Sequence, residues 1–219
     1  MAAPIDKLFV REFERKDGSI LTINQSEVGD VGCVVWDAAI VLSCYMETSD
    51  FYDVNANKNI LAGKRVIELG AGTGLVGLQA ACLGAKCTVT DLSEFIPLMQ
   101  LNIDANRHMV KTGSITAQTL KWGSDIVSFL PAPDYILLAD CIYYPQSLEP
   151  LVDTVVKLSS SRTITLCCYE ERTTGNKPEL EKNFFKLIHE SFTVEEIPLS
   201  RQDVTYRSPD IHIMRFTLR

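Results

Sequence analysis

The segment from Val66 to Gly74 carries the residues of this chain best suited to binding a small ligand. An apolar run with Glu68 near its end is followed by glycines at positions 70, 72 and 74. Glycines in such a turn let a ligand approach the backbone closely. Asp91 ends the next apolar run, where a carboxylate can accept hydrogen bonds from the two hydroxyls of a ribose. This order of residues predicts a ligand that contains a nucleoside.

Two nucleoside ligands fit the pattern, NAD and S-adenosylmethionine. The segment Gly72–Gly77 also satisfies the G-x-G-x-x-G dinucleotide fingerprint. However, Glu68 places a carboxylate where a pyrophosphate would bring its own negative charges, whereas a sulfonium compound with an α-amino group would be attracted there. The expected strand also ends at Leu69, so the fingerprint glycines begin late. We therefore favour S-adenosylmethionine over NAD.

Polar and aromatic side chains follow three further expected strands, in the segments 121–122, 140–144 and 169–172. Asp140 is the most informative of these residues, because a carboxylate at the end of the apolar run Tyr135–Ala139 must meet water, a ligand or a cation. Two interpretations of Trp122 remain open: its side chain covers the edge of the sheet, or it forms a wall of the adenine pocket. Trp36 is either a core residue of an apolar helix or part of a helix that folds over the cofactor.

The elements that must position these residues alternate between strand and helix from position 64 onward. Strands are expected at 65–69, 86–90, 114–120, 135–139 and 162–169, and helices at 74–83, 94–109, 148–158 and 178–190. This pattern predicts an α/β fold with an open, mostly parallel sheet covered on both faces, in which the late strands 192–197 and 211–218 form an antiparallel edge. Ligands in such sheets lie beyond the carboxyl ends of the strands, where the strand order reverses.

The first sixty residues are expected to be accessory to one domain that spans positions 1–219. They contain a predicted β-hairpin (8–13 and 19–25, joined by a turn with an Asp-Gly pair), an apolar helix at 33–45 and a polar loop at 49–60. Met1 to Val10 lacks the apolar stretch of a signal peptide, and no run approaches the length of a membrane span.

Charge and cysteine content limit the classes of function. The net charge of −7 argues against a nucleic-acid substrate, because neutralisation of phosphates dominates that kind of affinity. Seven cysteines without a C-x-x-C pair indicate reduced thiols. The three histidines lack the spacing of metal ligands, so we expect no metal site. We expect a soluble monomer of the cytoplasm, with the nucleus as a second compartment.

Two motifs resemble those of a known family. The segments Glu68–Gly74 and Asp140–Tyr143 resemble the glycine motif and the D-x-x-Y motif of the methyltransferase-like 21 group of seven-strand protein-lysine methyltransferases. Within that group, the chain looks most like the branch that modifies the ATPase valosin-containing protein, in the segments 31–39, 139–144, 167–173 and 206–213. The match extends from about Phe9 to the last expected strand.

The resemblance implies a fold, a site and a substrate. The implied fold is the Rossmann-like, seven-strand fold of class I methyltransferases. The implied S-adenosylmethionine site is lined by Trp36, Glu68, Gly70, Ala71, Gly72, Asp91, Leu92, Trp122 and Ala139, with Asp140 and Tyr143 between cofactor and substrate lysine. The implied partner is a protein, the AAA ATPase valosin-containing protein. An Hsp70-type chaperone, the substrate of a sister branch, is the alternative. An NAD-dependent dehydrogenase and a non-catalytic nucleoside-binding module are the competing classes.

The chemistry of lysine methylation suggests a role for each catalytic candidate. A lysine of pKa about 10.4 costs about 4.6 kcal/mol to neutralise at pH 7, and desolvation beside a sulfonium lowers that pKa. A carboxylate favours the ammonium form instead, so we assign Asp140 to capture and alignment of the lysine, with the proton leaving through water. Tyr143 can orient the amine through its hydroxyl. We expect Tyr143 and Tyr169 near the entrance.

Overall fold

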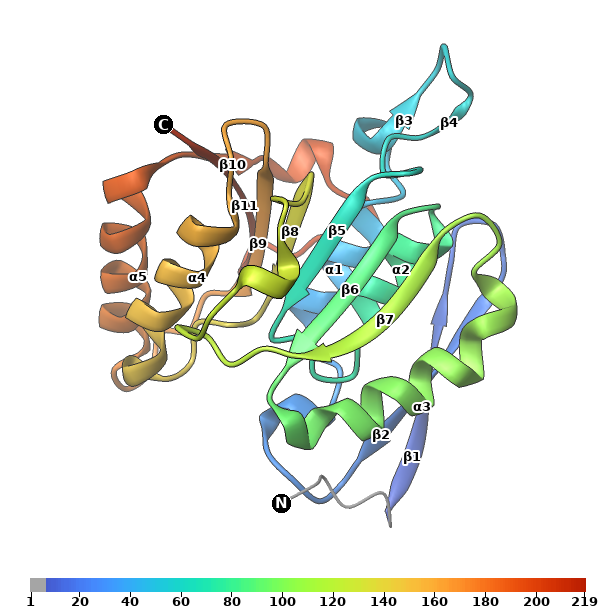
Figure 1. Cartoon of the computed structure of the whole chain (residues 1–219), viewed down its shortest axis with the longest axis horizontal. Helices are drawn as coiled ribbons and strands as arrows, with labels where there is room; N and C mark the ends of the chain where they lie inside the picture. Colours follow the sequence, from blue (N-terminus) through green and yellow to red (C-terminus); the bar gives the residue numbers. More distant parts are fainter. Residues whose placement is uncertain (1–6) are drawn as a thin grey trace.

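A seven-stranded sheet forms the centre of the protein, of which the computed structural model describes residues 7–219 (Figure 1). In spatial order its strands are β10 (Phe192–Ile197), β11 (Ile211–Leu218), β9 (Ile164–Glu170), β8 (Tyr135–Ala139), β5 (Arg65–Leu69), β6 (Lys86–Asp91) and β7 (Ser114–Thr119). The strands from β9 to β7 pair in parallel, whereas β11 pairs antiparallel with β9 and β10. The predicted sheet with an antiparallel edge is confirmed.

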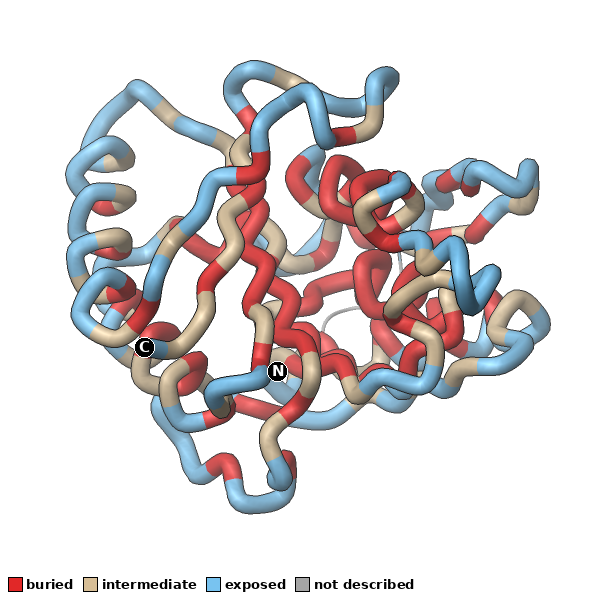
Figure 2. Tube along the Cα trace, turned by 90° about the horizontal axis from the view of Figure 1, so that it is seen from above, coloured by how far each residue is buried: buried red, intermediate tan, exposed pale blue. Residues whose placement is uncertain are grey.

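Helices cover both faces of this sheet (Figure 1). One face carries α1 (Asp37–Tyr45), α2 (Leu75–Cys82) and α3 (Ile96–Asn106), and the other carries α4 (Leu148–Leu158) and α5 (Lys177–Ser191). Successive strand residues point to opposite faces, so in β5 Val66 packs with the first group of helices and Ile67 with the second. Both faces are apolar because parallel sheets are buried on both sides. Buried residues accordingly follow the central strands in Figure 2.

The predicted N-terminal hairpin is confirmed as β1 (Leu8–Glu14) paired antiparallel with β2 (Ile20–Ser26). It packs on α3 through two buried asparagines of that helix, four residues apart. Asn102 Oδ1 accepts the backbone N–H of Asn24 at 2.7 Å, and Asn106 Oδ1 accepts that of Thr22 at 2.9 Å. These side chains therefore take the place of a further strand along part of β2.

Three predicted segments differ from the structure. The helix predicted at 33–45 begins only at Asp37, because Val31–Cys33 forms a 3-10 turn that Asp30 caps, after which Val34 is extended. The predicted loop at 49–60 contains a 3-10 turn and a short hairpin, β3 (Tyr52–Asp53) with β4 (Lys58–Asn59). The helix predicted at 94–109 is α3 flanked by 3-10 turns.

Within residues 7–219, no helix is long and apolar enough to cross a membrane. The prediction that the N-terminus lacks a signal peptide falls partly on residues 1–6, which lie outside the described residues.

Candidate active site

A cavity of about 480 Å³ opens beyond the carboxyl ends of β5 and β8. Its volume falls within the range of about 300–1,000 Å³ for small-molecule sites. The strand order reverses at this point, because β6 follows β5 on one side and β8 lies on the other. Every residue proposed from the sequence for cofactor binding or catalysis lines the cavity: Trp36, Glu68, Gly70, Ala71, Gly72, Asp91, Leu92, Trp122, Ala139, Asp140 and Tyr143.

The glycine turn between β5 and α2 forms one wall of the cavity. Gly70, Gly72 and Gly74 have φ angles of 66°, 53° and 82°, a region that favours glycine. A Cβ atom on Gly72 would lie 2.6 Å from the carbonyl oxygen of Gly32, in the loop that crosses the turn before α1. This wall therefore requires glycine for its conformation and for the close approach of a second backbone segment.

Asp91, at the end of β6, is held against the glycine turn by backbone groups. Its Oδ2 accepts the N–H of Gly72 at 2.8 Å, and its Oδ1 accepts the N–H of Leu92 at 2.7 Å. Burial raises the pKa of Asp91 to about 6, against the lowering effect of these two bonds. The carboxylate is thus mostly ionised at neutral pH, and each oxygen keeps a lone pair for a ligand hydroxyl.

Glu68 is deeply buried, with 2% of its surface exposed. Its Oε2 accepts the N–H of Gly77, in the first turn of α2, at 2.8 Å. Glu68 thus caps this helix, because the N-cap residue, Gly74, has no side chain that could accept a backbone N–H. Burial raises the pKa of Glu68 to about 8, so the carboxyl is mostly protonated at neutral pH. The sequence analysis treated Glu68 as a negatively charged group. In the structure, desolvation favours the neutral form of its carboxyl instead.

Two tryptophans contribute to the cavity wall. Trp122 packs against the core on the face of α4 and α5 and lies so close to Gly70 that a Cβ there would be 2.8 Å from Trp122 Cζ2. Trp36 is 40% exposed, and its Nε1 donates to the carbonyl oxygen of Val31 at 2.8 Å. Trp36 is therefore a rim residue at the start of α1, not a residue of the helix core.

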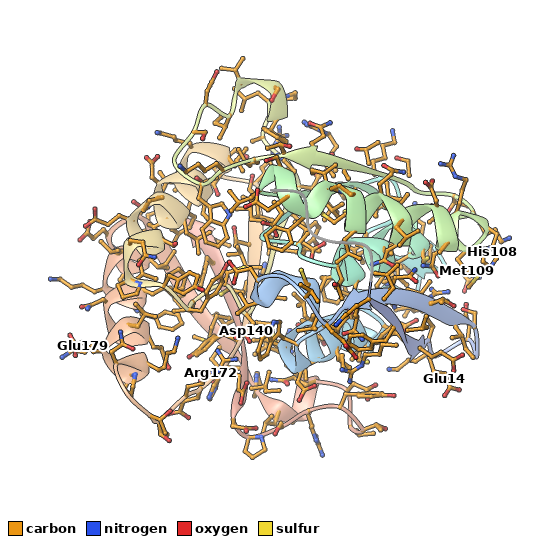
Figure 3. All side chains as sticks on the ribbon, turned by 90° about the horizontal axis from the view of Figure 1, so that it is seen from below. Glu14, His108, Met109, Asp140, Arg172 and Glu179 are labelled. Atoms are coloured by element: carbon orange, nitrogen blue, oxygen red, sulfur yellow. The ribbon has the colours of Figure 1, made fainter. Side chains whose placement is uncertain are left out.

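The carboxylate of Asp140, at the end of β8, is paired with Arg172, which follows β9. Arg172 donates from Nη1 to Asp140 Oδ1 at 3.1 Å and from Nη2 to Asp140 Oδ2 at 2.6 Å (Figure 3). The Asp140 side chain is 5% exposed, and its φ of 55° is rare for a residue other than glycine. The sequence marked the segment 169–172 as part of the site, but it carried no signal for this pairing.

The D-x-x-Y segment is also held from α5. Lys177 Nζ donates to the carbonyl oxygen of Tyr143 at 2.9 Å, and the Tyr143 ring meets that of Tyr144 edge-on, with centroids 4.7 Å apart. Burial raises the pKa of Tyr143, so its hydroxyl remains protonated. Tyr143 lines the cavity.

The expectation that Tyr169 lies near the entrance was wrong. Tyr169 is buried on the face of α5, where it packs against Phe185 and donates its hydroxyl to Glu181 Oε1 at 3.0 Å. Cys168, the preceding residue of β9, faces the side of the sheet that α1 covers. Successive strand residues alternate, so Tyr169 points to the opposite side. Among residues 7–219, no group of three or more His, Cys, Asp or Glu side chains could hold a metal ion.

Comparison with known proteins places this chain in a family. A sequence profile described as lysine methyltransferase matches residues 15–191. The chain belongs to the lysine methyltransferase family. Protein N-lysine methyltransferase METTL21A of Xenopus tropicalis is 34% identical over 86% of this chain and 79% of its own length. Protein-lysine methyltransferase METTL21E of Mus musculus is 36% identical over 76% of this chain and 65% of its own length.

These relatives show that this family member is an S-adenosylmethionine-dependent protein-lysine methyltransferase of the methyltransferase-like 21 group. The relatives METTL21A and METTL21E do not support the closer resemblance to the branch that modifies valosin-containing protein. The fold is shared with a Thermus thermophilus 16S rRNA methyltransferase, RsmC, solved with S-adenosylmethionine and guanosine. That similarity has a TM-score of 0.62 at 14% identity and covers 98% of this chain and 51% of RsmC.

Proposed function

We propose that one end of the cavity binds S-adenosylmethionine and that the other receives a lysine of a protein substrate. The observation that supports this division is the arrangement of the lining residues. The glycine turn, Asp91 and Trp122 come from β5, β6 and the segment after β7, whereas Asp140 and Tyr143 follow β8. Both sets of residues open into the same cavity, as a transfer between two bound molecules requires.

The residues of the first set fit the proposed cofactor. Asp91 presents a mostly ionised carboxylate suited to ribose hydroxyls, and the glycine turn gives a wall without side chains. Trp122, Leu92 and Ala71 supply apolar surface suited to an adenine ring. When bound, S-adenosylmethionine supplies an electrophilic methyl group on its sulfonium. Glu68, Trp36 and Ala139 complete the proposed binding site.

The second set of residues acts on the lysine. Asp140 attracts the ammonium group and aligns it, and Tyr143 orients the nitrogen through a hydroxyl that stays protonated. The mostly apolar cavity removes water from the amine, which lowers its pKa and lets the proton leave to solvent. Asp140 does not act as a general base in this scheme, because a carboxylate stabilises the protonated lysine.

The protein substrate is the finer part of the proposal. The segments 31–39 and 139–144 support the AAA ATPase valosin-containing protein. The METTL21A relatives favour the alternative, a chaperone of the Hsp70 type, and we give this alternative more weight. The seven cysteines are free thiols in the described part of the chain, which supports a cytoplasmic location.

Purified protein with radiolabelled S-adenosylmethionine tests the function and distinguishes the two substrates. We expect one dominant labelled protein band in cell lysate that nuclease treatment leaves unchanged, and label on a lysine of the matching purified substrate. Valosin-containing protein and an Hsp70 chaperone are tested side by side, with Asp140→Asn as the inactive control. Label found mainly in nucleic acid or small metabolites would overturn the proposal.

A further inference from the structure

We propose that Arg172 is a positioning residue that holds Asp140 in place and compensates its charge, so that a lysine can lose its proton beside that carboxylate. The inference rests on the proposed role of Asp140 in lysine binding and deepens it. It starts from a difficulty in that role. An uncompensated carboxylate within about 4–6 Å of an amine raises the pKa of the amine by about one to three units, which opposes methylation.

The contacts of Arg172 show how the difficulty is met. The guanidinium binds both oxygens of Asp140, a geometry that orients the carboxylate as well as neutralising it. It also donates to Glu170 Oε2 at 3.0 Å and lies over the ring of Trp36, 5.6 Å from the ring centroid. Arg172 therefore connects the ends of β8 and β9 with the start of α1, two of which contribute side chains to the cavity.

The pair is better shielded from solvent than an ordinary surface ion pair. The side chain of Asp140 is 5% exposed and that of Arg172 is 24% exposed. Asp140 also has a left-handed backbone conformation, and its N–H donates to the carbonyl oxygen of Cys168 at 2.8 Å. A residue with such a conformation persists when its surroundings determine it, and the two bonds from Arg172 are part of these surroundings.

The other charged and titratable groups around the pair do not replace Arg172. Glu170 adds negative charge, and Lys177 is engaged with the Tyr143 carbonyl. The cysteines near Asp140 have raised pKa values because they are buried, so they remain neutral thiols. The remaining ionisable groups that line the cavity with Asp140 are Asp30, Glu68, Asp91, Lys121, Tyr143 and Tyr144. Among the described residues, Arg172 is the cation that hydrogen-bonds to Asp140.

The pH profile of methylation tests the charge role. Arg172→Ala should reduce kcat about tenfold or more at pH 7 and move the rising, acidic limb of the profile to higher pH by about one unit, with activity recovering at high pH. Arg172→Lys restores the charge but not the two parallel bonds, so its profile should stay close to that of the wild type. Glu170→Gln removes the second carboxylate partner of Arg172 and leaves Asp140 paired; it is the matched control and should not move the profile to higher pH.

A double-mutant cycle of Asp140→Asn and Arg172→Gln, followed by chemical denaturation, tests the pairing without any activity. We expect the two substitutions to be coupled by about tenfold in the unfolding equilibrium constant. Additive effects would refute the pairing, and an unshifted profile in an active Arg172→Ala enzyme would refute the charge role. A wild type that methylates no protein would instead refute the proposed function, and with it this inference.

Discussion

The buried carboxyl of Glu68 should make the stability of the protein fall as the pH rises. In the unfolded chain this group loses its proton near its ordinary pKa of 4.5, whereas in the folded protein burial keeps the proton on up to about pH 8. The stabilising effect of the bound proton is complete below pH 4.5 and decreases as the pH rises toward 8, because the unfolded state then binds fewer protons than the folded state.

The size of the effect follows from the interval between the two pKa values. Each pH unit in that interval changes the free energy of unfolding by about 1.4 kcal/mol, so the step from pH 5 to pH 7 lowers it by about 2–3 kcal/mol. Glu68→Gln keeps an oxygen that can accept the N–H of Gly77 but cannot titrate. Between pH 5 and pH 7, the free energy of unfolding of the variant should therefore rise by about 2–3 kcal/mol relative to that of the wild type.

Urea denaturation of both proteins at pH 5, 6 and 7 measures this difference. Asp91 also has a raised pKa and titrates in the same range, but it is present in both proteins and cancels. A stability difference that does not change with pH would refute the reasoning, because Glu68 would then be ionised in the folded protein as it is in the unfolded chain.

The same carboxyl should report on the cofactor. If S-adenosylmethionine places positive charge near Glu68, binding lowers the pKa of the carboxyl and releases a proton at pH 7. Calorimetric titrations in two buffers with different ionisation enthalpies detect that proton, and Glu68→Gln should release none. Equal heats for the wild type in both buffers would show that the cofactor leaves Glu68 neutral.

Three further predictions concern the cavity. Gly72→Ala should weaken S-adenosylmethionine binding at least about tenfold in calorimetry, since its Cβ would lie 2.6 Å from a backbone oxygen. Gly63→Ala, at a glycine that also has a positive φ but has open space around it, should bind normally. The affinity for S-adenosylmethionine should fall about tenfold between pH 7 and pH 5 as Asp91, with its pKa of about 6, takes up a proton, and Asp91→Asn should flatten this dependence. Asp140→Asn should bind the cofactor but lose methylation of the protein substrate; normal turnover would reduce Asp140 to a structural residue.

Much of the candidate site could be predicted because its signals are local. A left-handed turn between a buried strand and a helix requires glycine, so Gly70, Gly72 and Gly74 mark it in the sequence. A carboxylate at the end of an apolar run stands out for a similar reason, and Asp91 and Asp140 were found in this way. The hairpin β1–β2 and the strand β8 follow from turn chemistry and short apolar runs.

Boundaries depended on contacts that a local pattern does not contain. The apolar residues 33–45 favour helix throughout, yet Cys33 ends a 3-10 turn, and Val34 and Trp36 are extended. The reason lies in the crossing of two loops, since a Cβ on Gly32 would be 2.8 Å from the ring of Phe95, and Gly72 approaches the Gly32 carbonyl. Packing over the glycine turn therefore outweighed the helical preference of these residues.

The sequence by itself determined the order of strands and helices, the glycine turn and the acidic residues at the strand ends, because each depends on neighbours along the chain. The tertiary structure decided which face each residue of β9 meets, and so buried Tyr169; a strand that is apolar on both faces shows no alternation in its sequence. It also decided the burial and protonation of Glu68 and the pairing of Asp140 with Arg172, which is 32 residues away along the chain. These depend on distance and desolvation, which arise only when β5, β8 and β9 lie side by side.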